Sequence, residues 1–184
     1  MSAEQTRIAL SSVAAQLSEA GGLLAEALIA SDAVKLAADD PALGALAATG
    51  PLSAGREAQI ALVVEAVYEG FLLHGGSSRI LNANDDELNI LAGDRLYALG
   101  LAELAAVGDL DSVRELADVI AICAQARALN DRALAGAAWQ LGASAIGWGS
   151  SPEAEQAKDA VCGDASAAAA ALIVAARQLR AVEA

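Results

Sequence analysis

The sequence predicts an all-α protein, a single-domain antiparallel bundle of helices. Alanine dominates the composition, prolines number only three in 184 residues, and runs of β-branched residues are short, so local propensity favours helix over most of the chain. With 56% hydrophobic residues, the chain is long enough to bury one core. We therefore expect one helical domain over residues 1–184, with a loop or broken helix at 38–56, where turn-forming residues concentrate.

The first half of the chain shows two early helices and one long apolar helix. Apolar residues at helical spacing between Leu10 and Leu17 predict a helix that ends at Gly21-Gly22. A second helix is expected over 23–37. The stripe Ile60, Val64, Val67, Phe71 and His74 predicts a buried helix that ends at Gly75-Gly76.

The next predicted helix covers residues 86–107, with Asn84 or Asp85 as its N-cap, and it carries apolar residues on two faces. A helix of this kind is usually central or at an interface. Gly93 and Gly100 fall on one side and would let another backbone approach closely. The stripe left for a second subunit is expected to contain Tyr97, Leu101 and Leu104.

Three further helices are expected in the C-terminal part of the chain. Asp109 or Ser112 caps the first, which buries Val113, Leu116, Ile120 and Ala124. The second extends from Asp131 to about Trp148. The third covers 152–182, with Ser151 as its cap and proline at its first position.

Charge and targeting signals exclude several classes of function. The formal net charge is −13 and no basic cluster is present, which argues against nucleic acid as a partner. Cys123 and Cys162 lack metal-type spacing and no signal peptide opens the chain, so a cytoplasmic location is expected. The uncharged stretch 133–152 is too rich in small residues for a transmembrane span. Trp139 and Trp148 are expected to be core anchors, but tryptophan also anchors proteins at lipid interfaces, so peripheral membrane contact stays open.

Two segments resemble the middle of a trans-isoprenyl diphosphate synthase. They read Leu-His-Gly-Gly-Ser-Ser-Arg over 73–79 and Asn-Ile-Leu-Ala-Gly-Asp-Arg-Leu-Tyr over 89–97. In that family an apolar helix ends in His-Asp-Asp-x-x-Asp, whose aspartates hold magnesium against an allylic diphosphate, and a later helix opens with Ile-Leu-Ala-Gly-Asp. Here His74 is followed by Gly75, Gly76 and Arg79 in place of the aspartates, so this degenerate motif cannot hold Mg²⁺, which needs oxygen ligands.

The resemblance covers roughly residues 65–128, and the family's other diphosphate-binding elements are absent. It implies a non-catalytic small subunit of a heterodimeric hepta- or hexaprenyl diphosphate synthase, with no catalytic residue, metal or cofactor of its own. The implied partner is a catalytic prenyl synthase subunit that carries both aspartate-rich motifs, or a second copy of this chain in a homodimer. The implied role is to help set the length of the prenyl product, and the implied ligand is an isoprenoid chain. The resemblance implies no activity for this chain by itself.

Two other readings stay open at this point. A stand-alone isoprenoid- or lipid-binding protein would show an apolar pocket. A structural homodimer would bury Tyr97 and Leu101 against their copies. An independent enzyme is the weakest reading, because the chain has one histidine and no evident carboxylate pair on an apolar face. We expect Asp94 to accept hydrogen bonds on a buried stripe, and Arg79 to pair with Asp85 or Asp86 at the surface or to bind an anion.

Overall fold

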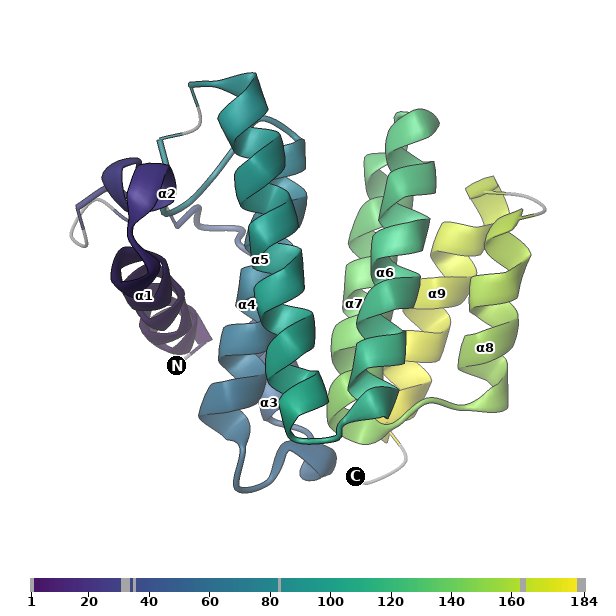
Figure 1. The fold of residues 1–184 in the computed structure, drawn as a ribbon. Helices are drawn as coiled ribbons and strands as arrows, with labels where there is room; N and C mark the ends of the chain where they lie inside the picture. The colour runs from purple at the N-terminus through teal and green to yellow at the C-terminus, as the bar shows by residue number, and fades with distance from the viewer. Residues whose placement is uncertain (1, 31–33, 35, 83, 163–164, 182–184) are drawn as a thin grey trace. The chain divides into compact units, whose positions relative to one another are not determined.

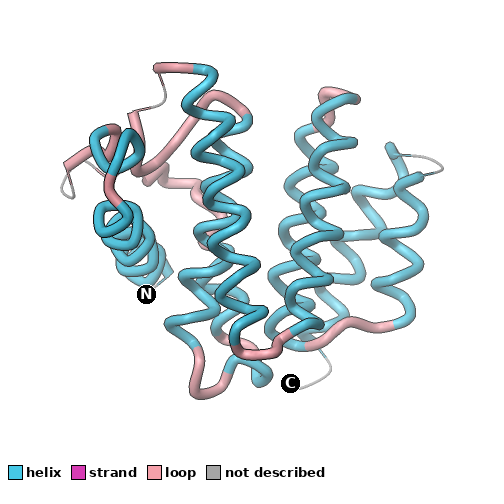
Figure 2. The backbone as a smooth tube through the Cα atoms, viewed as in Figure 1, coloured by secondary structure: helices cyan, strands magenta, loops and turns pink. Residues whose placement is uncertain are grey.

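The computed structural model describes residues 2–30, 34, 36–82, 84–162 and 165–181. The all-α class is confirmed: throughout these residues the regular elements are α-helices and short 3-10 helices, with no strand (Figures 1 and 2). The chain forms two compact units. Unit 1 contains Met1–Ala45 and Ala58–Val107, and unit 2 contains Leu46–Glu57 and Gly108–Ala184.

Unit 1 is built from four helices: α1 (Ser2–Ala20), α2 (Gly22–Glu26), α4 (Glu57–His74) and α5 (Asp86–Ala106). The short helix α3 (Leu43–Ala48) lies at the boundary of the two units, within the 38–56 segment. An apolar core cluster in this unit is formed by α1, α4, α5 and the segment after α4. Its largest side chains are Leu10, Val13, Leu17, Leu73, Ile80, Leu81 and Leu96.

The second predicted helix is much shorter than expected, because α2 ends at Glu26 rather than near residue 37. Beyond α2 the backbone hydrogen-bonds to the segment after α4. The Ile29 N–H donates to the carbonyl of Ile80 at 3.0 Å, and the Asn82 N–H donates to the carbonyl of Ala27 at 2.9 Å. These long-range bonds satisfy backbone groups that a continued helix would have used.

Glycines bring α4 and α5 of unit 1 close together. A Cβ added at Gly70 would lie 2.8 Å from the Gly93 carbonyl oxygen, and one added at Gly100 would lie 2.5 Å from Cγ2 of Val67. Both distances are too short for a real side chain. The close approach expected at Gly93 and Gly100 therefore occurs between two helices of the same chain.

Unit 2 contains α6 (Leu110–Ala128), α7 (Arg132–Trp148), α8 (Pro152–Asp159) and α9 (Ala165–Ala181), with the 3-10 helices η2 (Pro51–Ser53) and η3 (Ala160–Cys162). Helix α7 packs against both α6 and α9. Trp139 on α7 is buried. Where the sequence predicts one helix over 152–182, the structure has α8, η3 and α9, because α9 turns back to pack against α8 and α7.

Side-chain caps start α5 in unit 1 and α6, α7 and α8 in unit 2. Carboxylate oxygens of Asp85, Asp109 and Asp131 accept from the backbone N–H three residues on, and the Ser151 hydroxyl does the same for α8. Asp85, Asp109 and Ser151 are among the caps that the sequence predicts, and Asp131 is the predicted start of its helix. Within the described part of the chain, no helix is both long and apolar enough to cross a bilayer.

Candidate functional site

The degenerate motif begins at the C-terminal end of α4 with His74. Its Nε2 lies 3.1 Å from Oδ1 of Asp94 and 3.4 Å from the Ile90 carbonyl oxygen, both on α5. The His74 ring meets the Tyr97 ring edge-on, with 5.0 Å between centroids. His74 therefore joins the C-terminal end of α4 to the N-terminal half of α5. Asp94 faces a neighbouring helix as expected, but its side chain is 67% exposed rather than buried.

Gly75 and Gly76 terminate α4. Their N–H groups donate to the carbonyls of Leu72 and Leu73 at 2.8 and 2.9 Å, which satisfies acceptors left over at the helix end. Gly76 has a φ of +75°, a left-handed conformation that glycine adopts without strain. At these two positions the backbone turns, and neither residue has a side chain that could reach a ligand.

Arg79 is buried, and three carboxylates surround its guanidinium. Nε lies 2.8 Å from Oε2 of Glu69, Nη2 lies 2.8 Å from Oε2 of Glu65, and Nη1 lies 3.2 Å from Oδ2 of Asp40. The prediction that Arg79 pairs with Asp85 or Asp86 at the surface is wrong. Its partners are on α4 and on the segment before α3.

Glu65 and Glu69 lie one turn apart on α4, and both side chains are 0% exposed. Oε1 of Glu65 accepts from the Gly44 N–H at 2.9 Å. Oε1 of Glu69 accepts from the Arg79 N–H at 2.7 Å and from the Ser78 hydroxyl. The sequence interpretation that no carboxylate pair lies on an apolar face is therefore wrong. We call Asp40, Glu65, Glu69 and Arg79 the Arg79 cluster.

The electrostatics of the Arg79 cluster favour a permanently charged guanidinium. Burial opposes the charge on Arg79, but Glu65 and Glu69 raise its pKa above the ordinary value. Burial also raises the pKa of Glu65, against the opposing effect of Arg79. The guanidinium carbon lies 4.9 Å from the centroid of the Tyr68 ring, and burial raises the pKa of Tyr68 to about 12. The positive charge of Arg79 is therefore balanced by carboxylates of the same chain.

Unit 2 has a second ion cluster, in which Lys158 and Glu115 are buried and Asp118 and Glu155 lie toward the surface; the sequence did not suggest it. Nζ of Lys158 on α8 lies 2.7 Å from Oδ2 of Asp118, 2.8 Å from Oε1 of Glu155 and 3.1 Å from Oε2 of Glu115. Burial raises the pKa of Glu115, while Lys158 opposes that shift. This cluster ties α8 to α6.

The described residues contain neither a metal-binding cluster nor a reactive thiol. No group of three or more His, Cys, Asp or Glu side chains in that part of the chain is arranged to hold a metal ion. Cys123 is buried, and burial raises the pKa of its thiol to about 12. A thiol with so high a pKa is a poor nucleophile at neutral pH. The Cys162 side chain lies outside the described residues.

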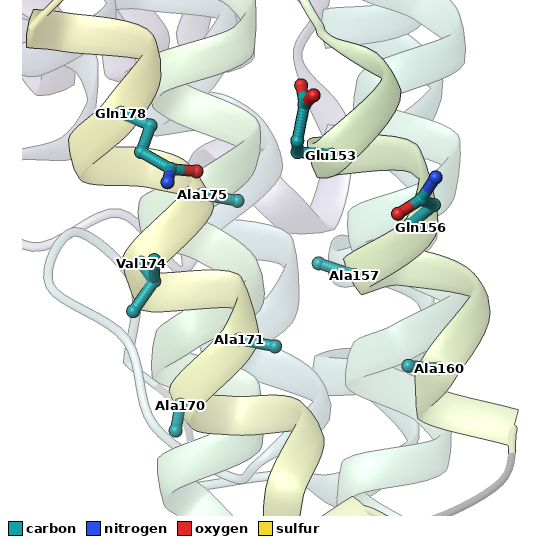
Figure 3. A pocket seen from close by; sticks show the side chains of 9 residues that line it. All are labelled: Glu153, Gln156, Ala157, Ala160, Ala170, Ala171, Val174, Ala175 and Gln178. Carbon is teal, nitrogen blue, oxygen red and sulfur yellow. The ribbon is translucent and has the colours of Figure 1, made fainter.

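An open groove of about 430 Å³ lies between α8 and α9 (Figure 3). Alanine methyl groups form most of its surface, with Glu153 and Gln178 toward one end and Ala160 and Ala170 toward the other (Figure 3). Its complete lining is Glu153, Gln156, Ala157, Ala160, Ala170, Ala171, Val174, Ala175 and Gln178. Polar groups that converge on one point, as in sites built for a small molecule, do not occur in this lining.

Most of the residues predicted to form an interface make contacts within the chain instead. Gly93 and Gly100 are buried against α4, and the Tyr97 ring lies over Gly70 and His74. The expectation that Leu104 is left for a second subunit is wrong, because this side chain is fully buried within the chain. Leu101 is half-buried. The exposed large apolar residues of α5 are instead Ile90 and Leu91.

Comparison of this chain with protein-family models, with curated proteins and with solved structures gave no match.

Proposed function

We propose that this chain is a non-catalytic, isoprenyl diphosphate synthase-like protein that acts as the small subunit of a heterodimeric polyprenyl diphosphate synthase. The observation that carries the proposal is the pairing of α4 with α5. The helix that ends in His74 packs against the helix that contains Gly93 and Asp94, while Gly75, Gly76 and Arg79 stand where the family has aspartates. The two resembling segments are thus neighbours in space.

The charges around Arg79 support a role without chemistry. A diphosphate is bound through cations, either metal ions or free Arg and Lys side chains. Arg79 already faces three carboxylates, and this excess of negative charge would repel a diphosphate. Substrate binding and metal chemistry must then come from a partner that carries both aspartate-rich motifs. This chain would complete the assembly and influence the length of the product.

The proposed role also suggests where the protein acts. Isopentenyl diphosphate and short allylic diphosphates are water-soluble, whereas the elongated product is an apolar chain. We therefore expect the complex in the cytoplasm, with its product passed toward a membrane.

A structural homodimer is the second candidate, and it is favoured by the 55% and 63% exposure of Ile90 and Leu91 on α5. In that case the chain would associate with itself and would need no catalytic partner.

The proposal is tested by co-expression with a prenyl synthase of the same organism that carries both aspartate-rich motifs. We expect the two chains to co-purify, and the complex to make a product of different length from that of the partner alone. With Mg²⁺, an allylic diphosphate and isopentenyl diphosphate, this chain alone should make no product. Elongation by this chain alone would contradict the proposal, as would a partner whose association and product length are unaffected by it.

A further inference from the structure

Residues 40–44 cover the side chain of Glu65, and we call this segment the strap. Nη1 of Arg79 donates to both carboxylate oxygens of Asp40, at 3.2 and 3.3 Å. The Gly44 N–H donates to Oε1 of Glu65 at 2.9 Å. A Cβ on Gly44 would lie 2.7 Å from Cγ of Glu65, so only glycine permits so close a contact. The strap therefore closes over Glu65, whose side chain is 0% exposed.

The strap is held by these contacts against a backbone preference. Ala42 has a φ of +48°, in the left-handed region that is unfavourable for a residue with a Cβ. Its N–H donates to Oδ1 of Asp40 at 3.2 Å. The strap is thus anchored at Asp40 and at Gly44, and both anchors involve the Arg79 cluster. A change in the charge of this cluster should therefore alter how firmly the strap is held.

The Arg79 cluster has more acidic groups than its single cation balances. With Asp40, Glu65 and Glu69 all ionised around Arg79, its net charge would be −2, and the side chains of both glutamates are 0% exposed. Like charges so close together in a dry site favour protonation of one of the carboxyls. The other titratable group beside Glu65 is Tyr68 on α4, which is neutral at neutral pH. Helix α3, which begins within the strap, has no titratable side chain.

Hydrogen bonding distinguishes Glu65 from the other two carboxyls. Glu69 accepts from the Arg79 N–H, from Nε of Arg79 and from the Ser78 hydroxyl, which is the role of a carboxylate. The Asp40 side chain is 14% exposed, so water reaches its charge. Oε2 of Glu65 lies 2.8 Å from Nη2 of Arg79, but neither of these two buried atoms makes a well-aligned hydrogen bond within the described part of the chain. Burial raises the pKa of Glu65, and Arg79 offsets this only in part.

We propose that Glu65 holds a proton in the folded chain, and that the strap closes over the protonated side chain and loosens when the proton is lost. With the strap open, Glu65 would meet water and titrate as an ordinary glutamate. Proton binding therefore favours the closed strap. The strap is held most firmly below the ordinary glutamate pKa, and it loosens as the pH rises to the raised pKa of Glu65. This inference requires no catalytic partner.

The first test follows the side-chain carboxyl carbon of Glu65 by ¹³C NMR while the full-length wild-type chain is titrated. We expect Glu65 to titrate at higher pH than Glu57, which is on the same helix and whose pKa is lowered by the Gly55 N–H. Sequential assignment identifies both resonances, so this test requires no variant. Titration of Glu65 at the same pH as Glu57, or at lower pH, would overturn the proposal.

The second test measures hydrogen exchange of the Gly44 amide, corrected for the pH dependence of exchange in an unstructured chain. In the wild type, its protection should fall as the pH rises toward the titration of Glu65, by at most about tenfold per pH unit, the limit for one proton. Glu65→Gln cannot ionise but keeps a carbonyl that can accept from the Gly44 N–H, so protection should not follow this titration. Glu57→Gln, the same change at an exposed position of α4, is the matched control and should keep the wild-type dependence.

Gly44 protection that is constant with pH in the wild type would contradict the proposal, as would an equal dependence on pH in Glu65→Gln. Circular dichroism verifies that both variants are folded. If Glu65→Gln does not fold, the titration of the wild type still decides the question. None of these measurements involves product formation or co-purification, so failure of this inference is distinct from failure of the proposed function.

Discussion

Arg79 binds Glu69 twice, through its backbone and through its side chain. The Arg79 N–H donates to Oε1 of Glu69 at 2.7 Å, and Nε donates to Oε2 at 2.8 Å. One carboxylate thereby fixes both the path of the chain after α4 and the direction of the guanidinium. Arg79 is therefore a structural anchor of unit 1.

Removal of the guanidinium should destabilise unit 1 strongly. Arg79→Met would leave Glu65 and Glu69 buried without a counter-charge, and breaking a buried ion pair in this way costs about 3–5 kcal/mol. The free energy of unfolding is measured by urea denaturation. The control is Arg95→Met on the exposed surface of α5, which should change it by less than about 0.5 kcal/mol. Equal losses in the two variants would show that the Arg79 cluster does not stabilise the fold.

Introducing aspartates at positions 75, 76 and 79 should not give the chain prenyl-elongation activity. Arg79→Asp would put a further carboxylate against Glu65 and Glu69, and like charges in a buried site repel strongly. We expect the triple variant Gly75→Asp, Gly76→Asp and Arg79→Asp to lose much of its helical circular dichroism. The double variant that keeps Arg79 should stay folded and inactive. Magnesium-dependent elongation by either variant would argue against our account of the site.

The contact between α4 and α5 should not tolerate even a methyl group at Gly70. A Cβ there would lie 2.8 Å from a backbone oxygen, that of Gly93, and overpacking of this kind costs about 1–3 kcal/mol. Gly136 is the matched control, because it lies within α7 and a Cβ at that position meets nothing within 4 Å. Gly136→Ala should instead stabilise the protein by about 0.5–1 kcal/mol. Thermal unfolding of the two variants gives the comparison.

The elements predicted from sequence are those whose causes are local. The cap residues Asp109, Asp131 and Ser151 act on an N–H three positions away, and the apolar stripe of α4 repeats at helical spacing. The early end of α2 was missed because its cause is a hydrogen bond to Ile80, which is distant in sequence. Helix propensity alone could not reveal it.

The surroundings of residues 74–79 could not be predicted from the sequence. Nothing in the sequence showed that Arg79 is buried, because one of its partners, Asp40, is 39 residues away. A usable signal was present in Glu65 and Glu69, two acidic residues at i and i+4 within an otherwise apolar helix. Such a pair must either face solvent or find a cation.

Stability should depend on pH through Glu115 in unit 2. Burial raises the pKa of Glu115 in the folded protein above its ordinary value, so the folded state binds this proton more tightly than the unfolded state. The contribution of Glu115 to stability is therefore present at low pH and lost as pH rises through the raised pKa. The free energy of unfolding of wild type relative to Glu115→Gln should fall over that range.

A variant of Asp109 is the control, because the contribution of Asp109 to stability should change with pH in the opposite direction. Its pKa is lowered although burial opposes the shift, because the carboxylate accepts from Ser112 and pairs with Arg56. Its contribution should be present above the ordinary aspartate pKa and lost as pH falls through the lowered value. Asp109→Asn should therefore lose stability relative to wild type at neutral pH and not in strong acid. If both variants followed the same trend with pH, the assigned directions would be wrong.

The contact of Gly50 with Gly147 has a consequence for biosynthesis. A Cβ on Gly50 would lie 2.2 Å from the carbonyl carbon of Gly147, so the η2 segment docks directly on the backbone of α7. The ribosome makes residues 46–57 well before α7, and all of α4 and α5 is made in between. Residues 46–57 therefore have no α7 backbone to pack against until that later helix has been synthesised. Truncation after residue 107 would leave this segment without its binding surface, so the two units cannot be separated by a single cut in the chain.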